Sequence, residues 1–342
     1  MRSIWLLHYL IKNERTLNVR ITNERNLPEA LVKAVENDSY NMGDADKSVT
    51  GLLQPARQSA LRELHADEVT EDASDRVYAL LGQLAHLLLE RAGEQDRNSL
   101  TEERLYTDVQ GFSDEPAWRI SGQTDTITLT PDQEGYTISD YKLCTVWKFK
   151  RDKFDPDTPV MPEEYEQQLN MYAHLLRVNG FQVDALKIVA MYRDWSIRES
   201  ERDQSYPQNV SEIHDVKLWD AEVAKWFIED RVRAHQEAIS TYRYNVDDLV
   251  ECSDEERWAK PAKYALKTNA KNVRARKLFD SQEDAVGWAE DPANKMKTGW
   301  VVEYRPGENV RCQRYCNVAE FCSQWQNLKN EEAKLASKEV AL

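Results

Sequence analysis

Gly122-Gln-Thr-Asp125 and Ser139-Asp-Tyr-Lys142 are the two stretches that decide the fold of this chain. β-branched and aromatic residues flank both stretches, and the turn sequence Pro131-Asp-Gln-Glu-Gly135 separates them. Residues 118–129 and 136–141 are therefore predicted to form the two strands of a β-hairpin.

The charged residues of this hairpin indicate a metal site. Because side chains alternate between the two faces of a strand, Asp140 and Lys142 share one face, and Asp125 joins them from the neighbouring strand. Two carboxylates this close repel each other unless a cation lies between them. A hard divalent ion such as Mg²⁺ binds carboxylate oxygens and keeps water molecules, one of which can attack a phosphodiester. A surface hairpin with ordinary charges is the alternative interpretation.

Two predicted helices add polar residues to this arrangement. His86 lies in a helix predicted over residues 74–92, on the face that also carries Gly82, where small residues allow another element to approach closely. The opposite face of that helix carries the apolar stripe Val77, Leu81, Leu84 and Leu88. In a later helix Gln168 and Tyr172 stand four residues apart and therefore project from the same side.

Taken in chain order, these residues resemble the RecB-like branch of the PD-(D/E)XK nuclease superfamily. The resemblance covers residues 75–200 and rests on His86, Asp125, Asp140-x-Lys142 and Gln168-x-x-x-Tyr172. It implies an α/β fold with a restriction-endonuclease-like core, in which helices flank a mixed β-sheet. The family accepts either Asp or Glu at the position of Asp140.

The resemblance also implies a role for each motif. The histidine and the two aspartates, with the carbonyl of Tyr141, would bind Mg²⁺ or Mn²⁺. Lys142 would orient the attacking water or stabilise charge on the phosphate. Gln168 and Tyr172 would support the site and the DNA. These implied catalytic residues are Asp125, Asp140, Lys142, Gln168 and Tyr172, and the implied metal ligands include His86.

Further candidates follow from the same resemblance. Glu103 lies near the start of a strand predicted over Thr101–Val109, and a glutamate in that strand binds metal in some relatives, although Glu102 is its immediate neighbour. Thr50 and Arg57 precede the histidine helix, where relatives contribute DNA contacts. A helix N-cap and a solvated arginine are the plainer interpretation of these two residues.

A basic and aromatic stretch, Trp147 to Lys153, follows the hairpin. Basic side chains suit phosphates and aromatic rings suit unstacked bases, so Lys148 and Lys150 are candidate DNA contacts. A strand end with lysines extending into solvent explains the stretch equally well.

Two later segments extend the predicted core. Residues 186–192 predict a buried strand, and with the preceding helix this strand implies a parallel pair joined by a right-handed crossover. Residues 218–240 predict another helix. Its predicted buried side carries Trp219, Val223, Trp226 and Phe227.

The five cysteines indicate a second metal centre. Three of them form the pattern Cys312-x3-Cys316-x5-Cys322. In a cytosolic chain, closely spaced thiols mark a metal more often than a disulfide. Zn²⁺ and a [4Fe–4S] cluster both prefer four ligands, and Cys252 in a polar stretch is favoured over Cys144 as the fourth. The alternative is that all five are buried apolar thiols.

Iron–sulfur members of the RecB-like family, including AddB and the CRISPR-associated nucleases, resemble the chain here as well. Their cluster is bound by one distant cysteine and a C-terminal Cys-x2-Cys-x5-Cys trio. In this chain the first gap is three residues, and the distant cysteine follows the nuclease motifs. The resemblance favours a [4Fe–4S] cluster, with structural Zn²⁺ as the alternative.

Between Cys252 and the cysteine trio, residues 259–305 predict a ββαβ insertion. Residues 259–279 contain seven Lys or Arg and no acidic residue. This local excess suggests a β-ribbon that contacts DNA. The candidate contacts are Lys271, Arg274 and Arg276. Alternatively, the insertion only covers the cysteine cluster, and its lysines serve solubility.

Composition limits the class of protein. The 342 residues carry a net charge of −15, which argues against coating nucleic acid by bulk charge but not against a local DNA groove. No apolar run is long enough for a membrane span, and residues 4–11 lack a following cleavage site. A cytoplasmic protein is expected, in a bacterial host cell if the gene belongs to a phage.

The predicted organisation has four segments. They are an N-terminal helical or extended segment (1–73), the PD-(D/E)XK nuclease core (74–245), the cysteine-cluster region (246–326) and a flexible charged tail (327–342). The predicted function is a Mg²⁺- or Mn²⁺-dependent DNA nuclease, an exonuclease in recombination, repair or phage DNA processing. Its predicted substrate is single-stranded DNA or duplex with an end. The alternatives are a non-catalytic DNA-binding subunit and a zinc-stapled RNA nuclease.

Overall fold

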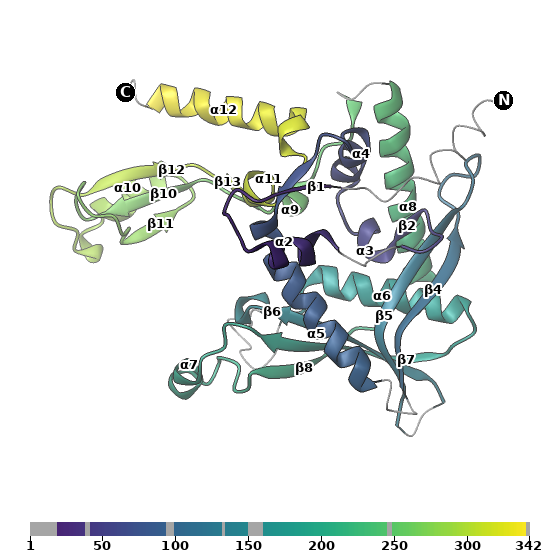
Figure 1. Ribbon diagram of the computed structural model, residues 1–342. Coiled ribbons are helices and arrows are strands. Elements are labelled where there is room, and N and C mark those ends of the chain that lie inside the picture. Colours follow the sequence, from purple (N-terminus) through teal and green to yellow (C-terminus); the bar gives the residue numbers. More distant parts are fainter. Residues whose placement is uncertain are drawn as a thin grey trace. The chain divides into compact units, whose positions relative to one another are not determined.

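A computed structural model describes residues 19–37, 42–93, 99–131, 134–149, 160–244 and 248–339. Lys150 and the basic residues up to Lys153 lie outside these ranges. The chain divides into two compact units, Met1–Tyr244 and Asn245–Leu342 (Figure 1). Within the described ranges, no helix is both long and apolar enough to cross a membrane.

The first unit contains a mixed set of helices and strands. Its helices are α2 (Glu29–Glu36), α3 (Val49–Leu52), α4 (Ala56–Leu64), α5 (Val77–Gly93), α6 (Glu163–Val178), α7 (Ile197–Arg202) and α8 (Ala221–Tyr244), with short 3-10 turns η1 (Ala73–Arg76) and η2 (Val146–Lys148). Its strands are β1 (Arg20–Thr22), β2 (Lys47–Ser48), β3 (Thr70–Asp72), β4 (Ser99–Val109), β5 (Trp118–Leu129), β6 (Tyr136–Cys144), β7 (Val183–Tyr192) and β8 (Ser211–Val216).

A six-stranded mixed sheet forms the centre of this unit, in the order β2-β5-β6-β7-β8 with β4 also paired to β5. The predicted hairpin is confirmed, because β5 and β6 pair antiparallel. The predicted parallel pair is confirmed as well, because β6 and β7 run parallel on either side of the α6 crossover. Thr126 pairs with Ser139, so the next position along each strand sets Asp125 opposite Asp140.

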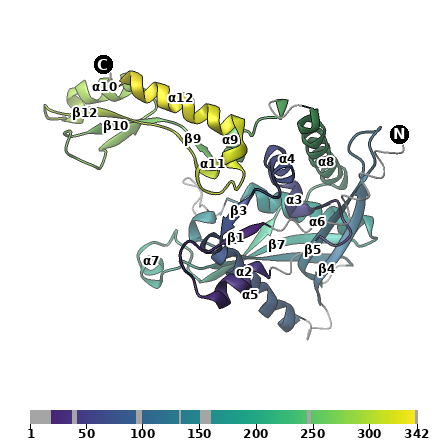
Figure 2. The ribbon, with the colours of Figure 1, turned by 45° about the horizontal axis from the view of Figure 1, so that its top comes forward.

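The segment before residue 74 also belongs to this unit. Strand β2 pairs in parallel with β5. Figure 2 shows β1 beside β3, and these two strands form a separate parallel pair. Strand β3 leads through η1 directly into α5, the helix that carries His86.

Helix α6 packs closely on the sheet at Gly122. A methyl group at this glycine would lie 2.9 Å from side-chain atoms of Tyr172 and Leu175. The glycine therefore lets α6 approach β5. Ile120 and Ile138 fill the core on either side of this contact and are completely buried. The close packing fixes the position of α6 relative to the residues that surround Asp125.

Helix α5 differs from the sequence-based expectation. Gly82 was expected to allow another element to approach, but a methyl group there would have nothing within 4 Å. Leu81, Leu84 and Leu88 are 42, 48 and 65% exposed. The helix touches β4, β5 and β6 without burying any residue fully.

The predicted buried side of the 218–240 helix is wrong for two of its four residues, whereas Phe227 does pack against the core. In α8 the side chains of Val223 and Trp226 are 49 and 60% exposed. The buried residues of α8 are Ala224, Ile228, Val232, His235, Gln236 and Ala238. Ala224, Ile228 and Val232, spaced four apart, set the centre of the buried face, with Phe227 at its edge and Trp226 outside it.

His235 is a buried titratable group on this face. Its Nε2 donates to the carbonyl oxygen of Leu52 at 3.1 Å, and the side chain has no exposed surface. Burial lowers the pKa of His235 from 6.5 to about 3, aided by the nearby charge of Lys47. The native protein therefore keeps this imidazole neutral at pH values where the unfolded chain protonates it.

We expect this histidine to make the first unit acid-sensitive. Below pH 6.5 the unfolded state binds the proton first, so stability is lost as the pH falls, by up to about 1.4 kcal/mol per pH unit. Urea unfolding of wild type and His235→Gln at pH 7.5, 6 and 5 measures the difference, and the variant should lose less free energy of unfolding between pH 7.5 and 5. Equal losses in the two proteins would contradict the neutral, buried state of His235.

The second unit is smaller and mostly made of short elements. Its helices are α9 (Asp254–Arg257), α10 (Gln282–Glu290), α11 (Val310–Arg314) and α12 (Ser323–Glu339), with turns η4 (Pro292–Asn294) and η5 (Ala319–Phe321). Its strands are β9 (Ala259–Lys260), β10 (Lys263–Lys267), β11 (Lys277–Phe279), β12 (Val301–Arg305) and β13 (Glu308–Asn309). Strands β11, β10 and β12 form an antiparallel sheet, with α10 following β11 in the chain.

Candidate active site

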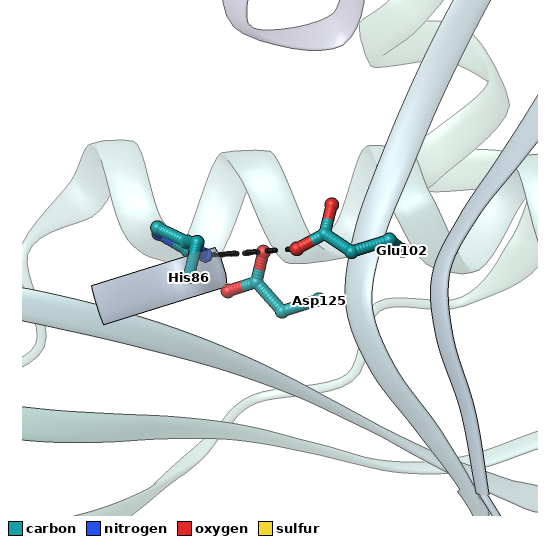
Figure 3. Close-up of side chains that lie close together, drawn as sticks. All are labelled: His86, Glu102 and Asp125. Carbon is teal, nitrogen blue, oxygen red and sulfur yellow. Dashed lines mark ion pairs between the residues drawn. The ribbon is translucent and has the colours of Figure 1, made fainter. Parts of the chain in front are cut away.

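Three side chains from separate elements of the first unit meet at one point (Figure 3). His86 comes from α5, Glu102 from β4 and Asp125 from β5, and one ligand atom of each lies within 4.8 Å of the others. His86 Nδ1 lies 3.2 Å from Asp125 Oδ1 and 3.8 Å from Glu102 Oε1. Among the described residues, this is the group of three His, Cys, Asp or Glu side chains that could hold a metal ion.

The register of β4 places Glu102, and not Glu103, in this group. Thr101 pairs with Thr126 and Glu103 with Thr124, which sets Glu102 opposite Asp125. Side chains of directly opposed residues share one face of the sheet, so Glu103 faces the other way and is exposed. Glu102 also has a positive φ of 52°, which is uncommon for a residue other than glycine.

Asp140 and Lys142 form a close ion pair beside the three-residue group. Asp140 is 2% exposed, and its Oδ2 lies 2.6 Å from Lys142 Nζ, with the geometry of an ion pair and not of an aligned hydrogen bond. Asp125 Oδ2 accepts a 2.6 Å hydrogen bond from the backbone N–H of Tyr141. Lys142 Nζ also lies 5.3 Å from the centre of the Tyr165 ring.

Gln168 and Tyr172 reach this pair from α6. Gln168 Nε2 lies 3.4 Å from Asp140 Oδ1, to which it donates, and 2.9 Å from the Tyr172 hydroxyl. Both side chains are buried. The structure thus gathers His86, Asp125, Asp140, Lys142, Gln168 and Tyr172 in one place.

The pKa values show that negative charge is crowded here. Burial raises the pKa of Asp140 to about 6, with Lys142 opposing the increase and Asp125 adding to it. Burial, and then the charge of Asp125, raise the pKa of Glu102. A hydrogen bond to Asp125 raises the pKa of His86 against the effect of burial. A divalent cation would offset this repulsion, and one imidazole with three carboxylates fits Mg²⁺ or Mn²⁺.

Gln123 supports Glu102 from the middle of β5. Its Nε2 donates to Glu102 Oε2 at 2.6 Å, and its Oε1 accepts from the Arg104 guanidinium. Glu102 therefore has one carboxylate oxygen near His86 and Asp125 and the other held by an amide. Sequence reasoning missed Glu102, Gln123 and Arg104 because their placement depends on how β4 pairs with β5.

All of these groups border one cavity of about 800 Å³. Its walls come from the end of α2, the start of α3, and from α5, β4, β5, β6 and α6. Thr50 also lines it, with its hydroxyl 3.1 Å from that of Ser48. Arg57, in contrast, is 3% exposed within α4, which does not suit the proposed DNA contact. Lys148 lies in η2, just after β6, where it pairs with Glu164 and lies 5.2 Å from the centre of the Tyr165 ring.

The cysteines near the C-terminus lie together in the second unit. Cys252 precedes α9, Cys312 lies in α11, and the last two follow α11 and η5. The Gln324 side chain accepts from the backbone N–H of Cys252 and donates to its carbonyl, both at 2.9 Å. This joins the distant cysteine to the first turn of α12, which begins just after Cys322.

The thiols of the trio are close enough to affect one another. Burial raises the pKa of Cys316 to about 11 and also raises that of Cys312, with a further increase from the neighbouring thiols. All five cysteines lie outside disulfides, and in the described part of the chain no three of them bring their sulfurs within 4.8 Å. Cys144 is buried in the first unit, at the end of β6.

The basic insertion is partly neutralised by its own acids. Lys263 pairs with Asp280, and Glu303 accepts from both Lys267 and Arg305, at 2.7 and 2.9 Å. The candidate contacts Lys271, Arg274 and Arg276 are exposed between β10 and β11. Arg276 lies over the Trp288 ring at 5.7 Å. The net basic surface is therefore smaller than the sequence suggests and concentrates in this loop.

Comparison with known proteins gives a family match. The profile of the PD-(D/E)XK nuclease superfamily matches residues 20–323. Among solved structures, protein SSO0001 is similar at 18% identity and a TM-score of 0.39, over 60% of this chain and 84% of that one. A candidate exonuclease from Eubacterium rectale is similar at 12% identity and a TM-score of 0.25, over 56% of this chain and 62% of that one. A search of curated proteins finds no match.

Proposed function

Because the chain belongs to the PD-(D/E)XK nuclease superfamily, we propose that it is a Mg²⁺- or Mn²⁺-dependent DNA exonuclease. Its substrate is a DNA strand with an end, in recombination, repair or phage DNA processing. The observation that carries this proposal is the meeting of the His86, Glu102 and Asp125 group with the Asp140–Lys142 pair in one cavity. Such a donor set would hold a hard cation near an ammonium group, and both can stabilise charge in phosphodiester hydrolysis.

Each residue has a distinct role in this mechanism. His86, Glu102, Asp125 and Asp140 would hold the ion, and Glu103 has no part in it. When bound, a divalent ion supplies a water of lowered pKa and offsets charge on the phosphate. Lys142 stabilises the negative charge that develops on the phosphate oxygens.

Outer residues hold these groups in position. Gln168 donates to Asp140 and Gln123 to Glu102, so each amide fixes the orientation of one carboxylate. Tyr172 in turn holds Gln168 from one turn further along α6. Thr50 borders the cavity, where its hydroxyl can contact the strand.

Digestion of end-labelled DNA tests the proposed activity. Linear single strands, linear duplexes and covalently closed circles are incubated with Mg²⁺, Mn²⁺ or EDTA. An exonuclease releases label from linear DNA and leaves circles intact, whereas cleavage of circles would replace the proposal with an endonuclease. DNA that is bound but never cut would indicate a non-catalytic binding subunit.

The proposed second cofactor is a [4Fe–4S] cluster held by Cys252, Cys312, Cys316 and Cys322. The link between Gln324 and Cys252, and the mutual effect of the trio on thiol pKa values, support a common site. Four thiolates suit such a cluster, and also suit structural Zn²⁺ as the alternative. Lys271, Arg274 and Arg276 are the proposed phosphate contacts of this unit.

We expect protein purified without oxygen to be brown and to contain about four iron and four sulfide per chain. Cys316→Ser should lose the iron and lower the thermal midpoint, since the centre closes a long loop. Cys144→Ser is the matched control and should keep the iron. Elemental analysis that finds one zinc per chain would select the zinc alternative, and absence of both metals would contradict a metal centre.

A further inference from the structure

Two elements that carry active-site residues also carry large exposed aromatic rings. Strand β6 bears Lys142 and leads into Trp147, which is 79% exposed. Helix α5 bears His86 and, eight residues earlier, Tyr78, which is 64% exposed. Eight residues of helix span about 12 Å, so Tyr78 lies within reach of a strand that passes His86.

A chain of contacts joins the Tyr78 ring to the backbone beside Trp147 at one end of the sheet. The Arg193 guanidinium lies 4.2 Å from the centre of the Tyr78 ring. Arg193 follows the last residue of β7, and its backbone N–H donates to the carbonyl of Cys144, the last residue of β6, at 3.0 Å. The N–H of Val146, next to Trp147, donates to Asp194 Oδ1 at 2.8 Å. Tyr78, Arg193 and Trp147 therefore border the ends of the same parallel strand pair.

The charge of this surface suits a nucleic acid. Arg193 is exposed, and its guanidinium lies over the Tyr78 ring; within the described ranges it forms no ion pair. An arginine stacked on an aromatic ring offers a flat face and a cation together. A solvent-facing tryptophan at the end of a catalytic strand adds a second flat face.

We propose that Tyr78, Arg193 and Trp147 form a stacking platform for the bases of an unpaired DNA strand. The proposal rests on the proposed nuclease function and specifies its substrate as a single strand or a frayed end. In a duplex the bases are stacked on each other, so only an unpaired strand presents base faces to protein rings. The rings hold the bases while the phosphate backbone passes the cavity that contains Lys142.

The platform predicts dependence on bases and not only on phosphates. Binding is measured by fluorescence anisotropy in Lys142→Met protein with Mg²⁺ present, using an oligo-dT strand, an abasic strand of equal length and a blunt duplex. The abasic strand keeps every phosphate but offers no base to stack. The parent protein should bind oligo-dT at least about 10-fold more tightly than the abasic strand.

Ring-removing variants test the assignment. Tyr78→Ala and Trp147→Ala should each weaken oligo-dT binding by about 10-fold and leave binding of the abasic strand unchanged. Trp226→Ala is the matched control, because Trp226 is another exposed tryptophan, on α8, with 60% of its surface accessible. It should change neither affinity.

Several results would overturn the platform. Equal affinity of the parent for oligo-dT and the abasic strand, or no binding of either, would show that stacking does not contribute. If the variants lost affinity equally for oligo-dT and for the abasic strand, the rings would act through folding or charge and not through stacking. If they lost affinity for the duplex alone, the rings would contact duplex DNA. If both variants bound every DNA as the parent does, the rings would have no role in DNA binding and a protein partner would be the remaining candidate. Base-dependent binding by a wild type that cuts no DNA would refute the nuclease and keep the platform.

Discussion

Replacing Lys142 by methionine is expected to lower the rate of DNA cleavage by at least about 100-fold. The ammonium group lies 2.6 Å from Asp140 and borders the same cavity as the proposed metal ligands. Methionine keeps most of the side-chain volume and removes the charge that stabilises the transition state. DNA binding should persist, because many other contacts contribute to it. Single-turnover cleavage of labelled DNA measures the effect.

Lys187→Met provides the matched control for this change. Lys187 lies on the adjacent strand β7 and pairs with Asp215 at the surface, at 2.8 Å. Its loss removes the same charge from the same sheet without touching the cavity, so turnover should stay within about twofold of wild type. Unchanged cleavage by a folded Lys142→Met protein would remove the proposed active site.

The second large effect separates two adjacent glutamates. Glu102→Gln should weaken Mn²⁺ binding by at least about 10-fold. Loss of a residue that only supports a metal ligand already costs about 10- to 100-fold in affinity. Glu103→Gln should leave affinity unchanged, because Glu103 is exposed on the opposite face of β4. Glutamine preserves the shape of each side chain and can still accept the hydrogen bond from Gln123. Titration calorimetry with Mn²⁺ measures both variants.

The reverse result would be equally clear. If Glu103→Gln lost metal affinity and Glu102→Gln kept it, the pairing of β4 with β5 would have to shift by one residue. Such a shift turns every side chain of β4 to the other face. A comparison of two neighbouring positions thus tests the strand register as well as the ligand.

Local sequence patterns were sufficient to predict the hairpin, the parallel crossover and the meeting of Asp125 with Asp140. Alternating apolar residues and the turn at Pro131–Gly135 carry that information within one short segment. Gln168 and Tyr172 were predictable for the same reason, since helical spacing alone places them on one side of α6. The order of these motifs along the chain then indicated the family.

Contacts between distant segments could not be read in this way. Choosing between Glu102 and Glu103 requires the register of β4 on β5, which the sequence of β4 does not specify. The predicted buried side of α8 is wrong at Val223 and Trp226, because Ile228 occupies the core in their place. The acids that neutralise Lys263 and Lys267 lie on later elements of the insertion. Each failure concerns a partner far away in the chain.

We propose that His86, Glu102, Asp125 and Asp140 together support metal-dependent hydrolysis of DNA. The most direct measurement removes metal from wild-type protein with EDTA, and then follows release of a terminal label from linear single-stranded DNA as Mg²⁺ or Mn²⁺ is restored. We expect no release without metal and saturable recovery as the ion is added. Release that persists in EDTA, or no release with either ion, would contradict it.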